Sequence, residues 1–368
     1  MENEEIIFID ELEEKQSIKE ENNKTVKTKK QKKKKSLKKW IVTFGLLDVI
    51  AVVCLFLMYG PFPYFRNLWV TSALTTATHE YFAYIFFDAE EVQKIMANNV
   101  VIEGNDSSKE EDIEFSGEDT GVYESIYEEQ ILKRDEGNDL YKVIDIEGDG
   151  YKGHMLVVYD PSRIDLVQAP NLKYGGKQLA KLLELNDGIA GINASGFNYS
   201  KETGYIPNGI VIMDNEIVWG ADKEPAKTGG IIGFTNDNKL ILTKSTAQEA
   251  LDMGIRDAVT FGPFLVVNGV PSEFKGNGGY GIAPRTAIGQ RRDGIVLMLV
   301  IDGRRPGHSL GVDMVELTNV LLKYGAYNAA NLDGGGSSSI VVEGEILSVA
   351  GGWGYTGERY IPNAIIIK

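Results

Sequence analysis

Two aspartates in the C-terminal half of the chain each follow an apolar run and precede a glycine. Asp302 ends residues 294–301, the most continuously apolar of the predicted strands, and Asp333 opens the sequence DGGGSSS. A carboxylate at a strand end lies beside a loop, where binding and catalytic residues concentrate. Glycines let backbone amides come close to a ligand and the serine hydroxyls add donors, so the second sequence suits phosphate oxygens.

The glycine triplet at 334–336 also has a purely structural explanation, because a tight turn with positive φ favours glycine. The neighbouring Asp333 and the three serines favour a ligand site instead. The sequence is not a Walker loop, since no Gly-Lys-Ser/Thr follows. It is not a dinucleotide fingerprint either, since it leads into a predicted strand rather than a helix. Nucleotide binding is therefore disfavoured.

Two further clusters contain polar residues that a site can use. Arg285 lies in an otherwise apolar stretch, residues 284–289, and a buried arginine requires an anion that is either structural or a ligand. Asn193 ends another apolar run, where its side chain can contact a sugar hydroxyl or brace the turn that follows. Ser195 lacks a Gly-x-Ser-x-Gly setting and the sequence has only three histidines, so a Ser-His-Asp hydrolase is disfavoured.

Together with Phe261-Gly262-Pro263 and Val267-Asn268-Gly269, these clusters resemble the phosphodiester glycosidase family over roughly residues 150–368. The resemblance implies a hydrolase that acts on glycans, in which Asp302 and Asp333 form the catalytic pair. It also implies a set of substrate-binding residues, namely Asn193, Arg285, Arg304, Gly334, Gly335, Gly336 and Ser337.

Three more residues near these clusters have weaker support. Glu316 matches a family position, but it also fits a capping pattern with Asp313, which gives it a structural role of equal weight. His308 and Arg305 lie in the loop after Asp302, where they can contact substrate, although the resemblance supports Arg304 more than either.

Glycoside cleavage commonly uses one carboxyl group to protonate the leaving oxygen and a second as nucleophile or base. A phosphodiester already provides a good leaving group, so a phosphate-binding arginine matters more than the acid. The separation of the two carboxyl groups distinguishes retention, at about 5–5.5 Å, from inversion, at about 6.5–9.5 Å. The predicted function is hydrolysis of a sugar-1-phosphodiester bond in a cell-surface glycan or glycopolymer, without a cofactor.

Two other functions fit the same residues. A non-catalytic glycan-binding or exopolysaccharide assembly protein at the cell surface would use the pocket without turnover. A metal-dependent phosphodiesterase would use Asp302, Asp313 and Asp333 as oxygen ligands for a divalent cation. Turnover of any kind excludes the first, and turnover that is insensitive to chelators excludes the second.

The chain from residue 141 to 368 predicts one α+β domain, with a mixed β-sheet core and a few flanking helices. Helical periodicity appears at residues 176–185 and 313–324. Short apolar runs bounded by turn residues predict strands at 154–159, 164–169, 189–193, 209–213, 231–234, 239–243, 259–267, 294–301, 339–342 and 361–367.

The N-terminal part predicts a membrane anchor. Residues 40–59 form an apolar run with one charge, Asp48, which is long enough for a transmembrane helix. Residues 24–39 hold ten lysines and no acid, so the positive-inside rule places the charged tail, residues 1–39, in the cytoplasm and the domain outside the cell. A cleaved signal peptide fits less well, because the apolar run is long and no small-x-small cleavage site follows it.

Between anchor and domain we expect a membrane-proximal stalk helix at residues 60–100 and an acidic, solvated linker at residues 101–140. The chain has a net charge of −15, of which residues 1–39 contribute +3 and the remainder −18. A nucleic-acid partner for the domain is therefore disfavoured. The single cysteine, Cys54, lies in the apolar run, so the chain has neither an internal disulfide nor a cysteine zinc site.

Overall fold

The computed structural model describes residues 19, 22, 24–26, 39–76, 79–104, 107–349 and 358–368. The chain divides into two compact units, Met1–Arg66 and Asn67–Lys368. In the first unit, a helix of 21 residues at Lys39–Tyr59 has a mean hydropathy of 2.7. By length and composition it can cross a membrane, since 21 residues at about 1.5 Å each span the roughly 30 Å of a bilayer core.

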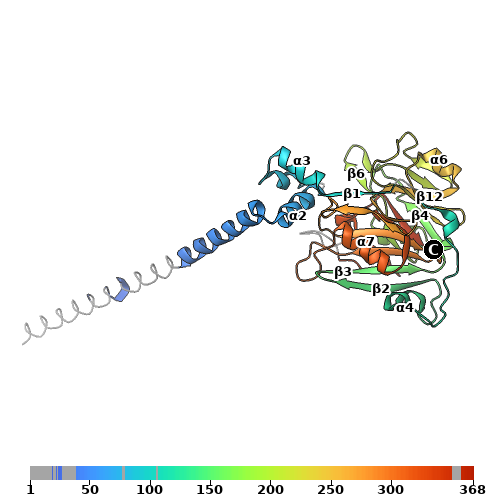
Figure 1. Cartoon of the computed structure of the whole chain (residues 1–368), viewed down its shortest axis with the longest axis horizontal. Coiled ribbons are helices and arrows are strands. Elements are labelled where there is room, and N and C mark those ends of the chain that lie inside the picture. The colour runs from blue at the N-terminus through green and yellow to red at the C-terminus, as the bar shows by residue number, and fades with distance from the viewer. Residues whose placement is uncertain are drawn as a thin grey trace, which may run out of the picture. The chain divides into compact units, whose positions relative to one another are not determined.

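The second unit is built around three antiparallel sheets (Figure 1). The largest has seven strands in the order β14-β13-β18-β16-β17-β3-β2. Its strands are β2 (Tyr141–Gly148), β3 (Tyr151–Val158), β13 (Phe264–Val267), β14 (Val270–Pro271), β16 (Arg285–Arg291), β17 (Val296–Ile301) and β18 (Ala326–Leu332).

Two five-stranded sheets complete the β structure, in the orders β20-β19-β5-β21-β4 and β11-β10-β12-β8-β9. The first contains β4 (Ile164–Gln168), β5 (Ala190–Asn193), β19 (Ile340–Val342), β20 (Glu345–Ile346) and β21 (Asn363–Ile367). The second contains β8 (Val211–Met213), β9 (Glu216–Trp219), β10 (Gly230–Thr235), β11 (Leu240–Thr243) and β12 (Ile255–Phe261). There are also two antiparallel two-stranded sheets. One pairs β1 (Val100–Ile102) with β15 (Glu273–Lys275), and the other is the hairpin of β6 (Phe197–Ser200) and β7 (Gly204–Pro207).

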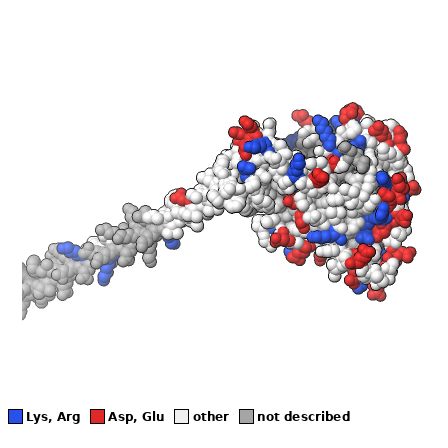
Figure 2. Space-filling model, viewed as in Figure 1, with Lys and Arg blue, Asp and Glu red and all other residues white. Residues whose placement is uncertain are grey.

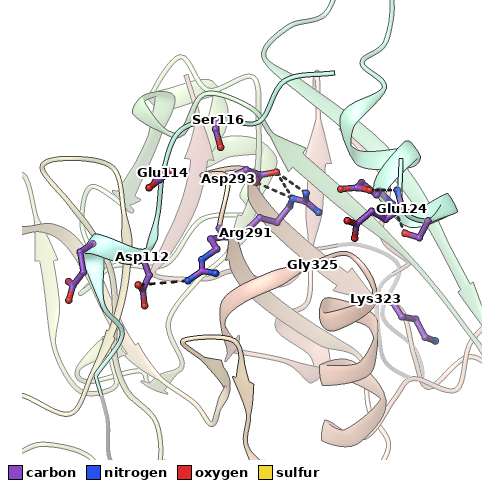
Figure 3. A pocket seen from close by; sticks show the side chains of 12 residues that line it. Asp112, Glu114, Ser116, Glu124, Arg291, Asp293, Lys323 and Gly325 are labelled. Carbon is purple, nitrogen blue, oxygen red and sulfur yellow. Dashed lines mark hydrogen bonds and ion pairs between the residues drawn. The ribbon is translucent and has the colours of Figure 1, made fainter. Parts of the chain in front are cut away.

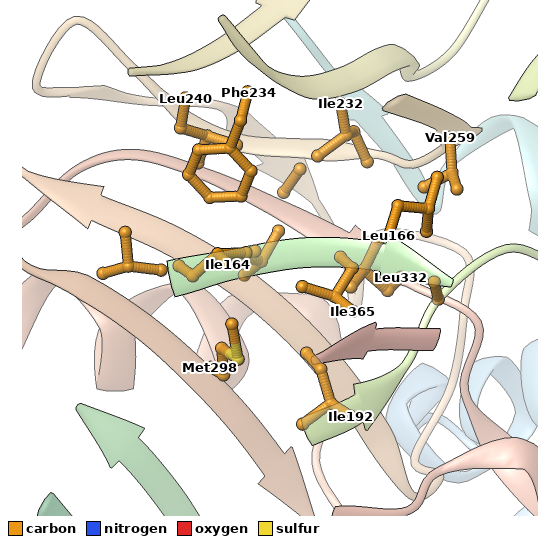
Figure 4. Packing of buried hydrophobic residues seen from close by; sticks show 14 of the residues in the cluster. Ile164, Leu166, Ile192, Ile232, Phe234, Leu240, Val259, Met298, Leu332 and Ile365 are labelled. Carbon is orange, nitrogen blue, oxygen red and sulfur yellow. The ribbon is translucent and has the colours of Figure 1, made fainter. Parts of the chain in front are cut away.

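The main core lies where the three sheets face one another. Figure 4 shows Met298 and Leu332 of the seven-stranded sheet beside Ile365 of one smaller sheet and Phe234 and Val259 of the other. These side chains are almost completely removed from water. Burial of each such side chain contributes about 1.5–3 kcal/mol, so this cluster is a major source of the stability of the fold.

Helices cover the outer faces of the sheets. The helices α4 (Ile126–Leu132) and α7 (Met314–Lys323) pack on the seven-stranded sheet, because α7 buries Met314, Leu317 and Leu321 on one face. The helices α5 (Leu179–Leu185) and α6 (Ala247–Asp252) pack on one five-stranded sheet each. One-turn 3-10 helices lie at η2 (Glu110–Asp112), η3 (Pro161–Arg163) and η4 (Gly335–Ser337).

The predicted α+β class and the predicted strands are confirmed, with one difference in the strands. The apolar run at residues 259–267 is two strands, β12 and β13, which belong to different sheets. Gly262-Pro263 separates them, because proline has no N–H for a strand ladder and so ends the pairing.

The segment at residues 60–100 differs from the single stalk helix that its pattern predicts. It contains α2 (Pro63–Leu74), the 3-10 helix η1 (Glu80–Tyr84) and α3 (Ala89–Ala97). Thr71 is fully buried and accepts a hydrogen bond from the Asn277 side chain (2.8 Å), and the Ser72 hydroxyl accepts from the Ile282 amide (3.3 Å). From residue 67 onward this segment is therefore part of the second unit.

Residues 101–140 also differ from the solvated linker that their composition predicts. Ile113 and Ile131 are buried, and the Glu103 side chain is only 3% exposed. The Glu103 carboxylate accepts hydrogen bonds from the amides of Gly229 (2.8 Å) and Phe264 (2.6 Å) and pairs with Lys244 (2.8 Å). A single acid thus ties this segment to two strands, although the segment contains few apolar residues.

On the face that Figure 2 shows, Lys and Arg are interspersed with Asp and Glu. A groove for polyphosphate backbones requires a basic stripe instead.

Replacing Glu103 should destabilise the protein strongly. Glu103→Ala leaves two strand amides without an acceptor and Lys244 without its partner, so we expect a loss of about 2–4 kcal/mol in the free energy of unfolding. Denaturant unfolding of the full chain in detergent measures this. Glu118→Ala, at an exposed position in the same segment, is the matched control and should change stability by less than about 0.5 kcal/mol. Equal stability of the two variants would show that the segment is not anchored through Glu103.

Candidate active site

The register of three neighbouring strands brings the predicted site residues to one edge of the large sheet. Arg285, which begins β16, pairs with Ile301 at the end of β17, and Thr286 pairs with Leu332 at the end of β18. The residues that follow β17 and β18 are Asp302 and Asp333. Because the strands are antiparallel, the start of β16 and the ends of its two neighbours lie at the same edge.

Asp333 is held through its backbone. Its amide donates to the Ala194 carbonyl (3.1 Å), and its carbonyl accepts from the Asn193 side-chain amide (2.6 Å). Asn193 is buried, and its oxygen accepts from the Thr286 hydroxyl (2.8 Å) and the Ser339 amide (3.0 Å). Asn193 therefore braces the loop that carries Asp333, whereas its contact with substrate stays a prediction.

The Asp333 carboxyl group has the electrostatics of a reactive acid or base. Burial raises its pKa from 3.8 to about 6. The Ser337 hydroxyl, the positive charge of Arg359 and the Gly334 backbone hydrogen bond each lower the pKa, but burial outweighs them. A carboxyl group with a pKa near 6 exchanges protons readily at neutral pH, as general catalysis requires.

The glycine loop after Asp333 uses part of its hydrogen-bonding capacity within the protein. The Gly335 amide donates to the Pro284 carbonyl (2.9 Å), and Gly335 has a φ of +64°, which favours glycine. Within the described residues the Gly336 amide has no hydrogen-bond partner. Of the three amides predicted to bind phosphate, the one at Gly336 is thus available.

Two arginine side chains lie beside this loop. A Cβ on Gly335 would meet the Arg304 guanidinium at 3.5 Å, so the guanidinium lies against the glycine backbone. Within the described part of the chain, the Arg304 guanidinium has no hydrogen bond or ion pair, and burial lowers its pKa. A phosphate bound here would supply the negative charge that the half-buried guanidinium needs and could accept a hydrogen bond from the Gly336 amide.

Arg285 is more deeply buried and is held by backbone carbonyls. It donates to Val312 (3.2 Å), Tyr280 (2.7 Å) and Gly281 (2.7 Å). Burial, together with the nearby charge of Arg304, lowers its pKa to about 10. Arg285 therefore adds positive potential next to Arg304, while direct contact with substrate stays a prediction.

Asp302 is fixed by two hydrogen bonds to its carboxylate. One oxygen lies 2.7 Å from His308 Nε2 and the other accepts from the Val349 amide at 2.8 Å. The Asp302 side chain is 2% exposed and the His308 side chain 38% exposed, so the imidazole is the more accessible member of the pair. The sequence indicated that His308 lay near the site, but its pairing with Asp302 depends on the fold of the loop.

Arg359 was missed in the sequence and lies at the site. Its guanidinium donates to the Ser337 hydroxyl (3.2 Å) and stacks 4.6 Å from the centre of the Phe197 ring. Its charge also lowers the pKa of Asp333. The available signal was an arginine just before an apolar strand, the same pattern that drew attention to Arg285.

The residues proposed as metal ligands are not gathered into one cluster. Asp313 is the N-cap of α7 and accepts from the Glu316 amide (2.9 Å), while the Glu316 carboxylate accepts from the Tyr151 hydroxyl (2.7 Å). Within the described residues, no group of three or more His, Cys, Asp or Glu side chains is placed to hold a metal ion. Both Asp313 and Glu316 have structural roles in this geometry.

A larger groove of about 940 Å³ lies elsewhere, between the segment at residues 111–128 and the turn after β16 (Figure 3). Its charges pair with one another: Arg291 with Asp293 (2.7 Å) and Arg292 with Asp112 (3.9 Å). None of the predicted site residues lines it. Size alone therefore does not locate the chemistry.

Comparison with known proteins identifies the family of the C-terminal region. Residues 186–368 match the family model of phosphodiester glycosidases, and the chain belongs to this family through that region. A stretch of 166 residues is 29% identical to the uncharacterized SPbeta prophage protein YomE of Bacillus subtilis, covering 44% of this chain and 25% of that protein. A stretch of 178 residues is 25% identical to N-acetylglucosamine-1-phosphodiester alpha-N-acetylglucosaminidase of Bos taurus, covering 48% of this chain and 29% of the bovine protein.

The solved catalytic domain of the zebrafish N-acetylglucosamine-1-phosphodiester alpha-N-acetylglucosaminidase, auto-inhibited by its pro-peptide, has a similar fold. Its TM-score is 0.52 at 18% identity, and the match covers 63% of this chain and 85% of the zebrafish chain. This likeness concerns the fold alone. The chain spans less than a third of the length of the prophage and bovine relatives.

The raised pKa of Asp333 predicts a pH-dependent stability difference. Its folded-state pKa exceeds the usual 3.8, so its stabilising contribution is complete below about pH 4 and is lost as the pH rises through about 6. Asp333→Asn should therefore be more stable than the parent at pH 8, on the order of 1 kcal/mol, and equal to it near pH 4. Unfolding of both proteins across this range tests it, with exposed Asp237→Asn as control. Destabilisation at every pH would contradict the assigned environment.

Proposed function

We propose that this protein is a membrane-anchored, extracytoplasmic hydrolase that cleaves a sugar-1-phosphodiester bond in a cell-surface glycan. The observation that carries the proposal is the placement of Asp333, with a pKa of about 6, in the same loop as the Gly336 amide, where the Arg304 guanidinium lies against Gly335. One group can act on the sugar while the other two hold the phosphate. The family match over residues 186–368 supports the same reaction class.

In the proposed reaction, water enters at the anomeric carbon and the bond from that carbon to the phosphate oxygen breaks. The bonding electrons leave with the oxygen, so the products are a free sugar and a phosphomonoester. The Asp333 carboxylate supports an oxocarbenium-like transition state as nucleophile or as base, and it receives the proton of the water when it acts as base. Arg304 and the Gly336 amide stabilise the charge that develops on the departing phosphate.

Asp302 is the second carboxyl group of the proposed pair. Its two hydrogen bonds fix its orientation, and the bond to His308 holds the imidazole at the surface of the site. Asp302 thereby fixes the orientation of the His308 imidazole. A phosphate monoester is a good leaving group, so the reaction does not depend on prior protonation of the leaving oxygen.

Two alternatives receive less support. A carboxyl group with a raised pKa costs stability at neutral pH. A glycan-binding or exopolysaccharide assembly protein has no use for such a group that would offset this cost. A metal-dependent phosphodiesterase needs converging oxygen ligands, whereas Asp313 caps a helix in this structure. A divalent cation that binds through substrate phosphate remains compatible with the reaction.

The anchor and orientation rest on the first unit. Residues 24–39, with their ten lysines, lead into the apolar helix at Lys39–Tyr59. Lysine-rich segments beside a membrane span usually lie on the cytoplasmic side. Asp48 is the one charge within residues 40–59 of this helix. We infer a single-pass protein of the cell membrane with a cytoplasmic N-terminus and an extracellular domain.

The position of bond cleavage tests the proposed reaction. Hydrolysis of a panel of sugar-1-phosphodiesters, including the methyl ester of N-acetylglucosamine 1-phosphate, should be carried out in ¹⁸O-labelled water and quenched early. Mass spectrometry should find the label in the sugar and none in the phosphate, whose oxygens do not exchange. Asp333→Asn should lower turnover by at least about 10³-fold while staying folded. Label in the phosphate would instead establish a phosphodiesterase.

Protease treatment of intact cells tests the orientation. External protease should remove the domain from full-length protein and leave an epitope tag at the N-terminus intact, because the lysine-rich tail lies inside. Permeabilised cells, in which both ends become accessible, are the control. Loss of the N-terminal tag from intact cells, with the domain protected, would reverse the assignment.

A further inference from the structure

A second groove, distinct from the one in Figure 3, lies next to the candidate active site. It has a volume of about 430 Å³, within the range of about 300–1,000 Å³ that ligand pockets commonly show. Its walls come from the turn at residues 173–177, the β6–β7 hairpin and Tyr360. The turn and hairpin are joined firmly, because the Tyr205 amide donates to the Leu172 carbonyl (2.8 Å).

The groove is continuous with the reactive carboxyl group through a chain of contacts. Arg359 bonds to Ser337, whose hydroxyl is hydrogen-bonded to Asp333. The Arg359 guanidinium stacks on Phe197, and the Phe197 ring lies 5.3 Å from the ring of Tyr205, which lines the groove. A chain bound at Asp333 can therefore extend over Phe197 into this groove.

Aromatic rings are gathered here and are unusually exposed. Tyr174 is 83% exposed, Tyr199 57% and Tyr360 51%. Tyr199 lies against Tyr205 with ring centres 4.8 Å apart, so the hairpin presents a paired aromatic surface. Exposed aromatic clusters mark binding sites, and the apolar C–H faces of sugar rings pack on such surfaces.

The charge of the groove is opposite to that of the chain. Three lysines line it, Lys173, Lys177 and Lys201, and its lining contains no acid, although the whole chain has a net charge of −15. Their ammonium groups have no ion pair within the described part of the chain. Glu202 follows Lys201 in the hairpin but does not line the groove. Free lysines between tyrosines suit a ligand that carries both sugar rings and anionic groups.

We propose that this groove binds the part of the substrate beyond the scissile bond, and that the substrate is an anionic, phosphate-linked glycan chain rather than a single-sugar diester. The inference rests on the proposed function for the site of cleavage. The tyrosines hold the next sugar rings, and the lysines hold the phosphates between them.

The test compares a short substrate with a long one. The short one is the methyl ester of N-acetylglucosamine 1-phosphate, and the long one is an oligomer of N-acetylglucosamine 1-phosphate units joined by phosphodiesters. The full-length triple variant Lys173→Gln/Lys177→Gln/Lys201→Gln should lower kcat/KM for the oligomer at least tenfold and change that for the methyl ester less than twofold. The matched control removes three exposed lysines elsewhere, Lys94, Lys109 and Lys275, and should affect neither substrate.

The aromatic contribution is tested separately at Tyr199. Tyr199→Ala should lower kcat/KM for the oligomer about fivefold to tenfold, and Tyr199→Phe should restore it, because the ring rather than the hydroxyl makes the contact. Equal losses on both substrates, or no loss on the oligomer, would overturn the groove while leaving the proposed reaction intact.

Binding provides a readout that does not depend on turnover. The oligomer should bind the wild-type chain more weakly as salt rises from 50 to 500 mM, since exposed ion pairs are screened, while uncharged N-acetylglucosamine oligomers should show no such dependence. If neither diester is hydrolysed, the proposed reaction fails. Loss of oligomer binding in the lysine variant then still supports the groove, and unchanged binding overturns it.

Discussion

The antiparallel register of β16, β17 and β18 is the constraint on which the site depends. It places the start of one strand beside the ends of two others, so Arg285, Asp302 and Asp333 leave the sheet at the same edge. Asn193, from the facing sheet, then fixes the Asp333 carbonyl and links it to Thr286 of β16. A shift of one residue in this register would turn the strand-end side chains to the opposite face and separate the charges.

Burial of one carboxyl group and two guanidinium groups explains the shifted pKa values at this end of the strands. Desolvation disfavours the charged forms of both the carboxyl group and the arginines, and it raises the pKa of Asp333 while lowering those of Arg285 and Arg304. A bound phosphate would reverse the cost for the arginines, since it supplies the missing negative charge.

The sequence predicted what depends on short-range pattern. Asp302, Asp333 and the glycine triplet stand out because each follows an apolar strand, and the strands and α7 follow from periodicity. It could not predict contacts between distant segments, such as Arg359 with Ser337, because an arginine that precedes an apolar strand does not reveal which side chain it will reach. The linker at residues 101–140 was misjudged for a related reason. The segment is attached through the carboxylate of Glu103 rather than through apolar side chains. A prediction from the number of apolar residues cannot detect such an attachment.

The membrane-proximal segment and the site share one loop. The carbonyls of Tyr280 and Gly281 accept the hydrogen bonds of Arg285, and the same loop bonds to Thr71 and Ser72 of α2 through Asn277 and Ile282. Gly281 packs so closely on Ser72 that a Cβ there would lie 2.6 Å from its backbone. The loop that holds Arg285 is therefore itself held by α2, so the helix that precedes the domain contributes to the position of the Arg285 side chain.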